Sequence, residues 1–81
     1  MELLIFSSKT CIPCKKLKNI LDKDNIKYTE IDIEDEPEKT CEFNIGCVPT
    51  LIRLDGNEIK GKLAGLHSKT SIYEFLEMEQ V

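Results

Sequence analysis

The chain has 81 residues, of which 41% are hydrophobic and 32% are charged, a balance typical of one small folded domain rather than a disordered segment. The net charge of −4 argues against a nucleic-acid-binding protein, because phosphate contacts need clustered lysine and arginine. The longest apolar run, Leu3–Phe6, is far shorter than the about 20 residues of a membrane span. No basic stretch leads into an apolar one, as it would in an export signal. We therefore expect a single domain over residues 1–81, in the cytoplasm and without membrane contact.

The apolar residues alternate in some stretches, as in strands, and recur every three or four residues in others, as in helices. The predicted elements in chain order are a strand over Glu2–Phe6, a helix from Ile12 to about Asp24, a strand over Lys27–Glu34, a short helix that starts within Asp35–Glu38 and runs to about Phe43, strands over Thr50–Leu54 and Glu58–Leu63, and a helix after Ser68 to about Met78. Asn25 is expected to end the first helix.

These elements predict an α/β fold in the order β-α-β-α-β-β-α. The first two strands are joined through a helix, so we expect them to be parallel with a right-handed crossover. The last two strands are joined by Asp55-Gly56-Asn57, a signal for a tight hairpin, so we expect them to be antiparallel. The pattern therefore predicts a four-stranded mixed sheet with helices on both faces.

Four cysteines in a chain without an export signal need a reason other than structural disulfides, which cytosolic reductants keep open. Cys11 and Cys14 form a C-x-x-C pair where the first strand passes into the first helix, a position typical of redox pairs. The start of a helix favours negative charge, so we expect Cys11 to form the nucleophilic thiolate. Cys14 lies one turn further on and can resolve a mixed disulfide at Cys11, with Pro13 stiffening the turn. Cys11 and Cys14 are therefore the predicted catalytic residues.

A zinc site is the alternative for these residue types, and the available ligands are Cys11, Cys14, Cys41, Cys47 and His67. Cys41 and Cys47 flank a predicted helix end instead of forming a tight knuckle, so redox chemistry is favoured and no metal is expected. We expect both to be small packing residues. Cys47 is also a candidate regulatory thiol, because it lies two residues before Pro49. His67 is expected to be an exposed loop residue.

Four stretches of the chain resemble the thioredoxin superfamily, and together they run through almost its whole length. The thioredoxin motif C-G-P-C-K is similar to Cys11–Lys15, with Ile12 in place of glycine. The motif Y-x-I-x-x-I-P-T-L is similar to Glu42–Ile45 followed by Val48–Leu51. The thioredoxin hairpin turn resembles Asp55–Glu58, and the motif G-x-x-S-K before the final helix resembles Gly65–Lys69. The resemblance implies a thioredoxin-like fold and a thiol–disulfide oxidoreductase that works as a monomeric electron carrier without a cofactor.

The resemblance also implies a cis peptide bond before Pro49 and a substrate groove beside the cysteines. The backbone of Val48 would pair with a substrate segment as an added strand. The substrate-binding residues that follow from the resemblance are Thr10, Ile12, Pro13, Val48, Pro49, Gly65 and Leu66.

The implied activity is the reduction of disulfides in target proteins, with ribonucleotide reductase or a metabolic enzyme as the candidate target. The electron donor would be a thioredoxin reductase or glutathione. The chain departs from thioredoxins at Thr10, where Trp is usual, and in its first strand, which lacks the buried Asp that helps the second cysteine lose its proton. Release by Cys14 would then be slower, or would depend on solvent or on another group such as Lys9.

The short length and these two departures resemble glutaredoxins more than thioredoxins. Pro13 and the stretch His67–Lys69 differ from glutaredoxins, which prefer Tyr and acidic residues at these places. We therefore favour a thioredoxin-like activity on a scaffold of glutaredoxin size. A glutathione-dependent glutaredoxin is the alternative, followed by a non-catalytic or metal-binding module of the same fold.

Charge is unevenly distributed along the chain. Lysines surround the predicted redox pair at positions Lys9, Lys15, Lys16 and Lys18, whereas acidic residues gather in Glu30–Glu42. A solvated surface is the simple interpretation. The sharper hypothesis is that the lysines steer acidic partners to the reactive end.

Overall fold

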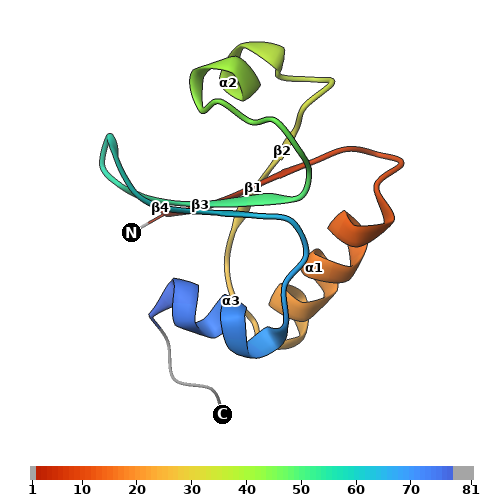
Figure 1. Cartoon of the computed structure of the whole chain (residues 1–81), viewed down its shortest axis with the longest axis vertical. Coiled ribbons are helices and arrows are strands. Elements are labelled where there is room, and N and C mark those ends of the chain that lie inside the picture. The colour runs from red at the N-terminus through yellow and green to blue at the C-terminus, as the bar shows by residue number, and fades with distance from the viewer. Residues whose placement is uncertain (1, 78–81) are drawn as a thin grey trace.

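The computed structural model describes residues 2–77, and the order of their elements confirms the predicted α/β architecture (Figure 1). The elements are β1 (Glu2–Ser7), α1 (Ile12–Lys23), β2 (Thr29–Asp32), α2 (Pro37–Glu42), β3 (Thr50–Asp55), β4 (Glu58–Ala64) and α3 (Lys69–Leu76). The predicted extension of the last helix to Met78 lies outside the described residues. None of the helices within residues 2–77 is long and apolar enough to cross a membrane.

The four strands form one mixed sheet in the order β2-β1-β3-β4. β1 runs parallel to β2 and antiparallel to β3, and β3 and β4 form the predicted antiparallel hairpin. β2 is shorter than the predicted strand over Lys27–Glu34, because its ladder with β1 runs only from Leu4 opposite Thr29 to Ser7 opposite Asp32. The alternating pattern therefore continues at both ends beyond the residues that have a strand partner.

Helices cover both faces of the sheet, with α2 on one side and α1 and α3 on the other (Figure 1). The alternation of β1 divides its side chains between two cores, because successive strand residues point to opposite faces. Leu3 and Ile5 join one core and Leu4 and Phe6 the other. The first core also contains Leu17 and Leu21 from α1, Leu51 from β3, and Ile72 and Leu76 from α3. The second core contains Ile31, Ile52 and Leu54, with Phe43, Ile33 and Ile45 packed against it.

The helix ends follow local sequence rules. Cys11 is the N-cap of α1, and Ser68 caps α3 by accepting a hydrogen bond from the backbone N–H of Ser71 at 3.3 Å. Asn25 and Asn44 follow α1 and α2 with positive φ angles of 56° and 54°, a conformation that asparagine tolerates well. Asn25 therefore lies where the sequence predicted the end of the first helix.

Gly61 of β4 lies beneath a packed pair of side chains, and this gives a test of the fold. The guanidinium of Arg53 lies 5.3 Å from the centre of the Phe75 ring. A Cβ atom on Gly61 would approach Phe75 Cε1 to 2.9 Å and Arg53 Nε to 3.2 Å. We expect Gly61→Ala to lower the free energy of unfolding by about 1–3 kcal/mol through overpacking, measured by urea denaturation.

Gly46→Ala is the matched control, because a Cβ atom there would meet no atom within 4 Å. We expect this variant to stay within about 0.5 kcal/mol of the parent protein. Equal stability of the two alanine variants would contradict the packing of Arg53 and Phe75 over β4.

Candidate active site

Three loops meet at one end of the sheet because of the strand register. Thr50, the first residue of β3, lies opposite Phe6 near the end of β1 and opposite Ala64 at the end of β4. The segments that follow β1, precede β3 and follow β4 therefore leave the sheet at the same place. The backbone N–H of Gly65 donates to the carbonyl oxygen of Pro49 at 2.7 Å and ties two of these loops together.

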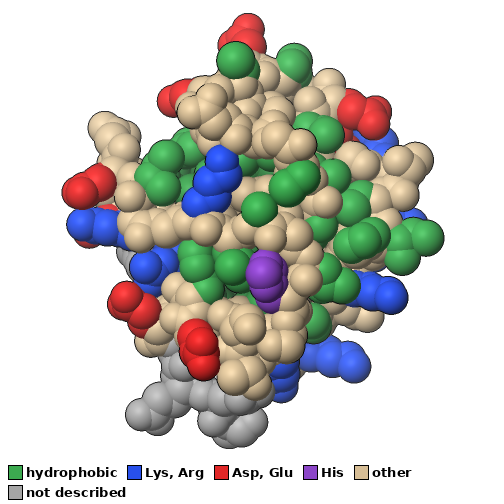
Figure 2. All heavy atoms as spheres, in the orientation of Figure 1, with side chains coloured by type: hydrophobic (Ala, Val, Ile, Leu, Met, Phe, Trp, Pro, Cys, Tyr) green, Lys and Arg blue, Asp and Glu red, His purple; other side chains and the backbone are tan. Residues whose placement is uncertain are grey.

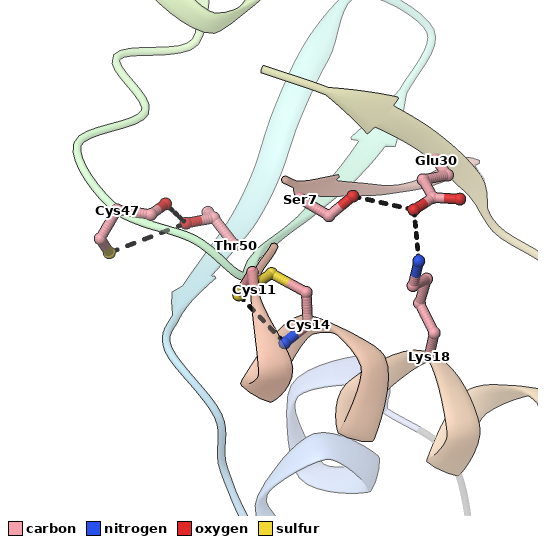
Figure 3. The surroundings of a disulfide bond; sticks show 7 residues. All are labelled: Ser7, Cys11, Cys14, Lys18, Glu30, Cys47 and Thr50. Carbon is pink, nitrogen blue, oxygen red and sulfur yellow. Dashed lines mark hydrogen bonds and ion pairs between the residues drawn. A yellow bond between two sulfur atoms is a disulfide. The ribbon is translucent and has the colours of Figure 1, made fainter. Parts of the chain in front are cut away.

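Cys11 and Cys14 are joined by a disulfide at the start of α1, with their Cα atoms 5.3 Å apart (Figure 3). Cys11 is half-buried, whereas Cys14 is completely buried. The backbone N–H of Cys14 donates to Cys11 Sγ at 3.2 Å. When the pair is reduced, the same N–H and the positive end of the helix favour a thiolate at Cys11.

The Val48–Pro49 peptide bond is cis, and this loop leads into β3. Neither backbone group of Val48 makes a hydrogen bond to another residue within 2–77. Val48 is half-buried, and Pro49 beside it is fully buried. An unpaired donor and acceptor thus lie at the end of the sheet where the cysteines lie.

The other residues implied as substrate contacts differ in exposure. Ile12 is 64% exposed and Leu66 is 41% exposed. Thr10 and Pro13 are exposed, and Gly65 is half-buried with a φ of 88°. Gly65 and Pro49 are brought together by their hydrogen bond, and Ile12 and Pro13 adjoin the disulfide along the chain.

A polar network anchored on one buried residue, Ser7, lies near the disulfide and was not predicted from the sequence. The hydroxyl of Ser7, which is 1% exposed, donates to Glu30 Oε2 at 2.9 Å. Lys18 Nζ reaches the same oxygen at 2.6 Å. Lys18 lies four residues after Cys14 on α1, so the network connects the cysteine-bearing helix to β1 and β2 (Figure 3). The i, i+4 spacing from Cys14 was the only sequence signal for it.

The charges in this network act on Glu30. The hydrogen bond from Lys18, supported by that from Ser7, holds the pKa of the Glu30 carboxyl below its usual range. Lys9, considered above as a substitute for the absent acid, instead forms an exposed ion pair with Asp35 at 3.4 Å. The hydrogen bond to Asp35 raises the pKa of Lys9, and the ion pair places its ammonium group beside the segment that precedes α2.

Cys41 and Cys47 are exposed free cysteines, so the prediction that they are packing residues is wrong. α2 buries none of its own residues, and Phe43 and Ile45 after it pack against the core instead. The carbonyl oxygen of Cys47 accepts a hydrogen bond from the Thr50 hydroxyl at 2.8 Å. This bond fixes the backbone of the loop and leaves the Cys47 thiol at the surface.

The candidate zinc ligands named from the sequence do not form a metal-binding cluster within residues 2–77. No group of three or more His, Cys, Asp or Glu side chains within residues 2–77 is arranged to hold a metal ion. His67 is half-buried rather than exposed, and its Nε2 lies 2.7 Å from the carbonyl oxygen of Ala64.

The mixed sheet, the disulfide at the start of α1 and the cis proline opposite it define a dithiol protein of the thioredoxin fold. Residues 3–59 match the glutaredoxin family model. A thioredoxin from Buchnera aphidicola is 30% identical over an alignment of 81 positions, which covers 93% of this chain and 75% of that protein. NADPH-dependent thioredoxin reductase 3 from Arabidopsis thaliana is 31% identical over 81 residues, or 15% of its length.

The structure of thioredoxin 1 from Thermosipho africanus superposes with a TM-score of 0.76 at 25% identity, covering 95% of this chain and 91% of that one. The chain therefore belongs to the thioredoxin superfamily, and its Cys11–Cys14 pair is that of a thiol–disulfide oxidoreductase. The resemblance found in the sequence motifs and the predicted fold class are thus confirmed.

The Glu30 network predicts a pH dependence of stability. The pKa of Glu30 is lower in the folded than in the unfolded protein, so its carboxylate stabilises the fold at pH values above the ordinary glutamate pKa of about 4.3. This stabilisation is lost as the pH falls through the folded-state pKa. We expect Glu30→Gln to be less stable than the parent at pH 7 and equally stable near pH 2. Urea denaturation across this range measures the difference.

Glu42→Gln is the control, because Glu42 is exposed and makes no ion pair within residues 2–77. Its stability difference from the parent should be small and change little with pH. A constant difference between Glu30→Gln and the parent across the range would show that the Lys18–Glu30 charge pairing contributes nothing.

Proposed function

We propose that this protein reduces disulfides in target proteins, with Cys11 as the nucleophile and Cys14 as the resolving thiol. The observation that carries the proposal is the asymmetry of the pair. Cys11 is partly accessible and receives an N–H hydrogen bond on its sulfur, whereas Cys14 is buried beneath it. A target can reach Cys11 first, and Cys14 can attack only a sulfur held at Cys11.

The reaction has two exchange steps. The Cys11 thiolate attacks one sulfur of the target disulfide, and the other sulfur leaves as a thiolate that takes up a proton. The Cys14 thiolate, formed by loss of its proton, then attacks Cys11 Sγ and breaks the mixed disulfide. The target gains two electrons and two protons, and the Cys11–Cys14 disulfide remains for a reductant to reopen.

The surroundings of the disulfide suit a protein substrate. The unpaired backbone groups of Val48 can add a short strand of the target to the end of the sheet. Ile12 and Leu66 offer exposed apolar contacts to the side chains of that strand. We propose that Thr10, Pro13, Pro49 and Gly65 complete this groove.

The electron donor divides two versions of the function. The match to part of an NADPH-dependent thioredoxin reductase supports a thioredoxin-reductase-type donor. The glutaredoxin family match supports glutathione as the second candidate. A monomer in the cytoplasm that serves ribonucleotide reductase or a metabolic enzyme is the physiological setting that we propose.

The two cysteine roles predict opposite results for two serine variants. Cys14→Ser should accumulate a mixed disulfide between Cys11 and the target, because the resolving thiol is gone. Cys11→Ser should reduce the target no faster than the uncatalysed background. Turbidity of reduced insulin and intact-protein mass spectrometry measure the two outcomes.

Cys41→Ser is the matched control, because Cys41 is an exposed free cysteine on α2. It should retain the parent rate. Turnover that persists without Cys11 would overturn the proposed mechanism.

The choice of donor is tested by comparing two coupled assays on the same oxidised protein. We expect NADPH with thioredoxin reductase to reopen the disulfide faster than glutathione with glutathione reductase. Rapid turnover of a glutathione mixed disulfide, together with no measurable rate in the thioredoxin reductase assay, would instead assign a glutaredoxin activity to the protein.

A further inference from the structure

The four lysines near the disulfide are not equivalent. Lys9 is paired with Asp35 and Lys18 is paired with Glu30, so their charges are largely balanced. The other two, Lys15 and Lys16, are exposed and make no ion pair with any residue in 2–77. Both directly follow Cys14 in α1. Lys15 lies beside a hollow that Glu30, Asp32, Asp35 and Glu36 also line, and Lys16 does not line that hollow. The unpaired lysines therefore lie on the first turns of α1, with Lys16 the one away from these acids.

The same turns of α1 carry the exposed apolar side chain of Ile12. Lys16 lies four residues after Ile12, and residues at this spacing share one face of a helix. Figure 2 shows apolar side chains extending to the edge of the molecule over the start of α1, with basic side chains beside them. The start of α1 therefore combines an exposed apolar side chain with basic side chains.

Acidic side chains gather in two places: a hollow lined by Glu30, Asp32, Asp35 and Glu36, which Lys15 shares, and the surface around α2. Figure 2 shows them over α2 and at the far side of the sheet. Glu34, Glu38 and Glu42 around α2 are exposed and make no ion pair within the described part of the chain. An acidic partner segment would be repelled by these acids and attracted most strongly beside Lys16, with Lys15 adding positive charge at the edge of the hollow.

We propose that the surface formed by Ile12, Pro13, Lys15, Lys16 and Leu66 docks target disulfides whose neighbouring residues on the α1 side are acidic. This inference rests on the proposed function and adds its substrate class. Complementary charge at the rim of a contact changes mainly the association rate and the choice of partner. The chemistry at Cys11 and Cys14 is the same for every disulfide, so the lysines select among targets without taking part in exchange.

The test uses three peptide disulfides that differ only in the residues flanking the cystine, which are acidic, neutral or basic. At low salt we expect the parent protein to reduce the acidic peptide with the highest kcat/KM. K15E/K16E should lower that value by about 3- to 10-fold, raise the value for the basic peptide, and leave the neutral peptide within about twofold. The preference for the acidic peptide should disappear at 1 M salt, where charges are screened.

K23E/K27E is the matched control, because Lys23 and Lys27 are exposed, make no ion pair within residues 2–77, and give the same change in net charge. It should change the rate with the acidic peptide by less than about twofold. K15Q/K16Q provides a milder second variant if the charge reversal affects folding. Equal losses in K15E/K16E and K23E/K27E would overturn the proposal, because net charge rather than the position of Lys15 and Lys16 would then be responsible.

A second measurement separates docking from chemistry. The same peptides with serine in place of both cysteines are titrated into the oxidised protein, and backbone amide shifts are followed by NMR. We expect the acidic peptide to bind most tightly and to shift the first turns of α1, whether or not reduction occurs. Binding of this kind without any reduction would refute the proposed function alone, whereas reduction without acidic preference in rate or binding would refute the docking surface alone.

Discussion

Strand β1 lies between β2 and β3, and its residues Leu3–Ser7 are buried because both faces of the sheet are covered there. An unpaired charge in this strand would lose its hydration, which is strongly unfavourable. The ion pair that Ser7 contacts therefore comes from the neighbouring elements, with Lys18 on α1 and Glu30 on the edge strand β2. Ser7 at the end of β1 connects the buried strand to this pair by a neutral hydroxyl group. Where thioredoxins have a buried acid in the first strand, β1 of this protein is apolar, and the Lys18–Glu30 ion pair lies beside the end of that strand.

The same buried strand also determines how the two cysteines differ. α1 packs on β1 through a stripe that includes Leu17 and Leu21, and Cys14 belongs to that stripe. Cys11 lies before the first turn, as the N-cap, and so stays partly accessible. The two thiols therefore differ in accessibility because Cys14 lies on the face of α1 that packs on the sheet, whereas Cys11 lies before the first turn. A single short helix is sufficient to present one thiol and shelter the other.

Local patterns in the sequence predicted most of the fold and the reactive pair. The alternation in β1, the helical stripe of α1 and the turn at Gly56 each depend on residues close together in the chain. The Ser7–Glu30–Lys18 network joins three elements, so it depends on the strand register that no local pattern contains. The prediction that Cys41 and Cys47 are packing residues failed for a related reason. Phe43 and Ile45 occupy the core beneath α2, and a sequence does not show which of several apolar neighbours will fill it.

The distribution of paired charges also changes how the overall charge of −4 should be interpreted. At physiological ionic strength the screening length is about 8 Å, so a docked partner responds to the nearest charges rather than to the sum. Lys9 and Lys18 act at that range as parts of nearly neutral pairs. Lys16 is an exposed, unpaired cation four residues after the exposed Ile12, and Lys15 beside it is also unpaired but shares a hollow with acidic side chains. An acidic protein can therefore present a weakly basic contact surface where its reactive sulfur lies, and selection among otherwise equivalent disulfides can arise from two side chains that take no part in the exchange.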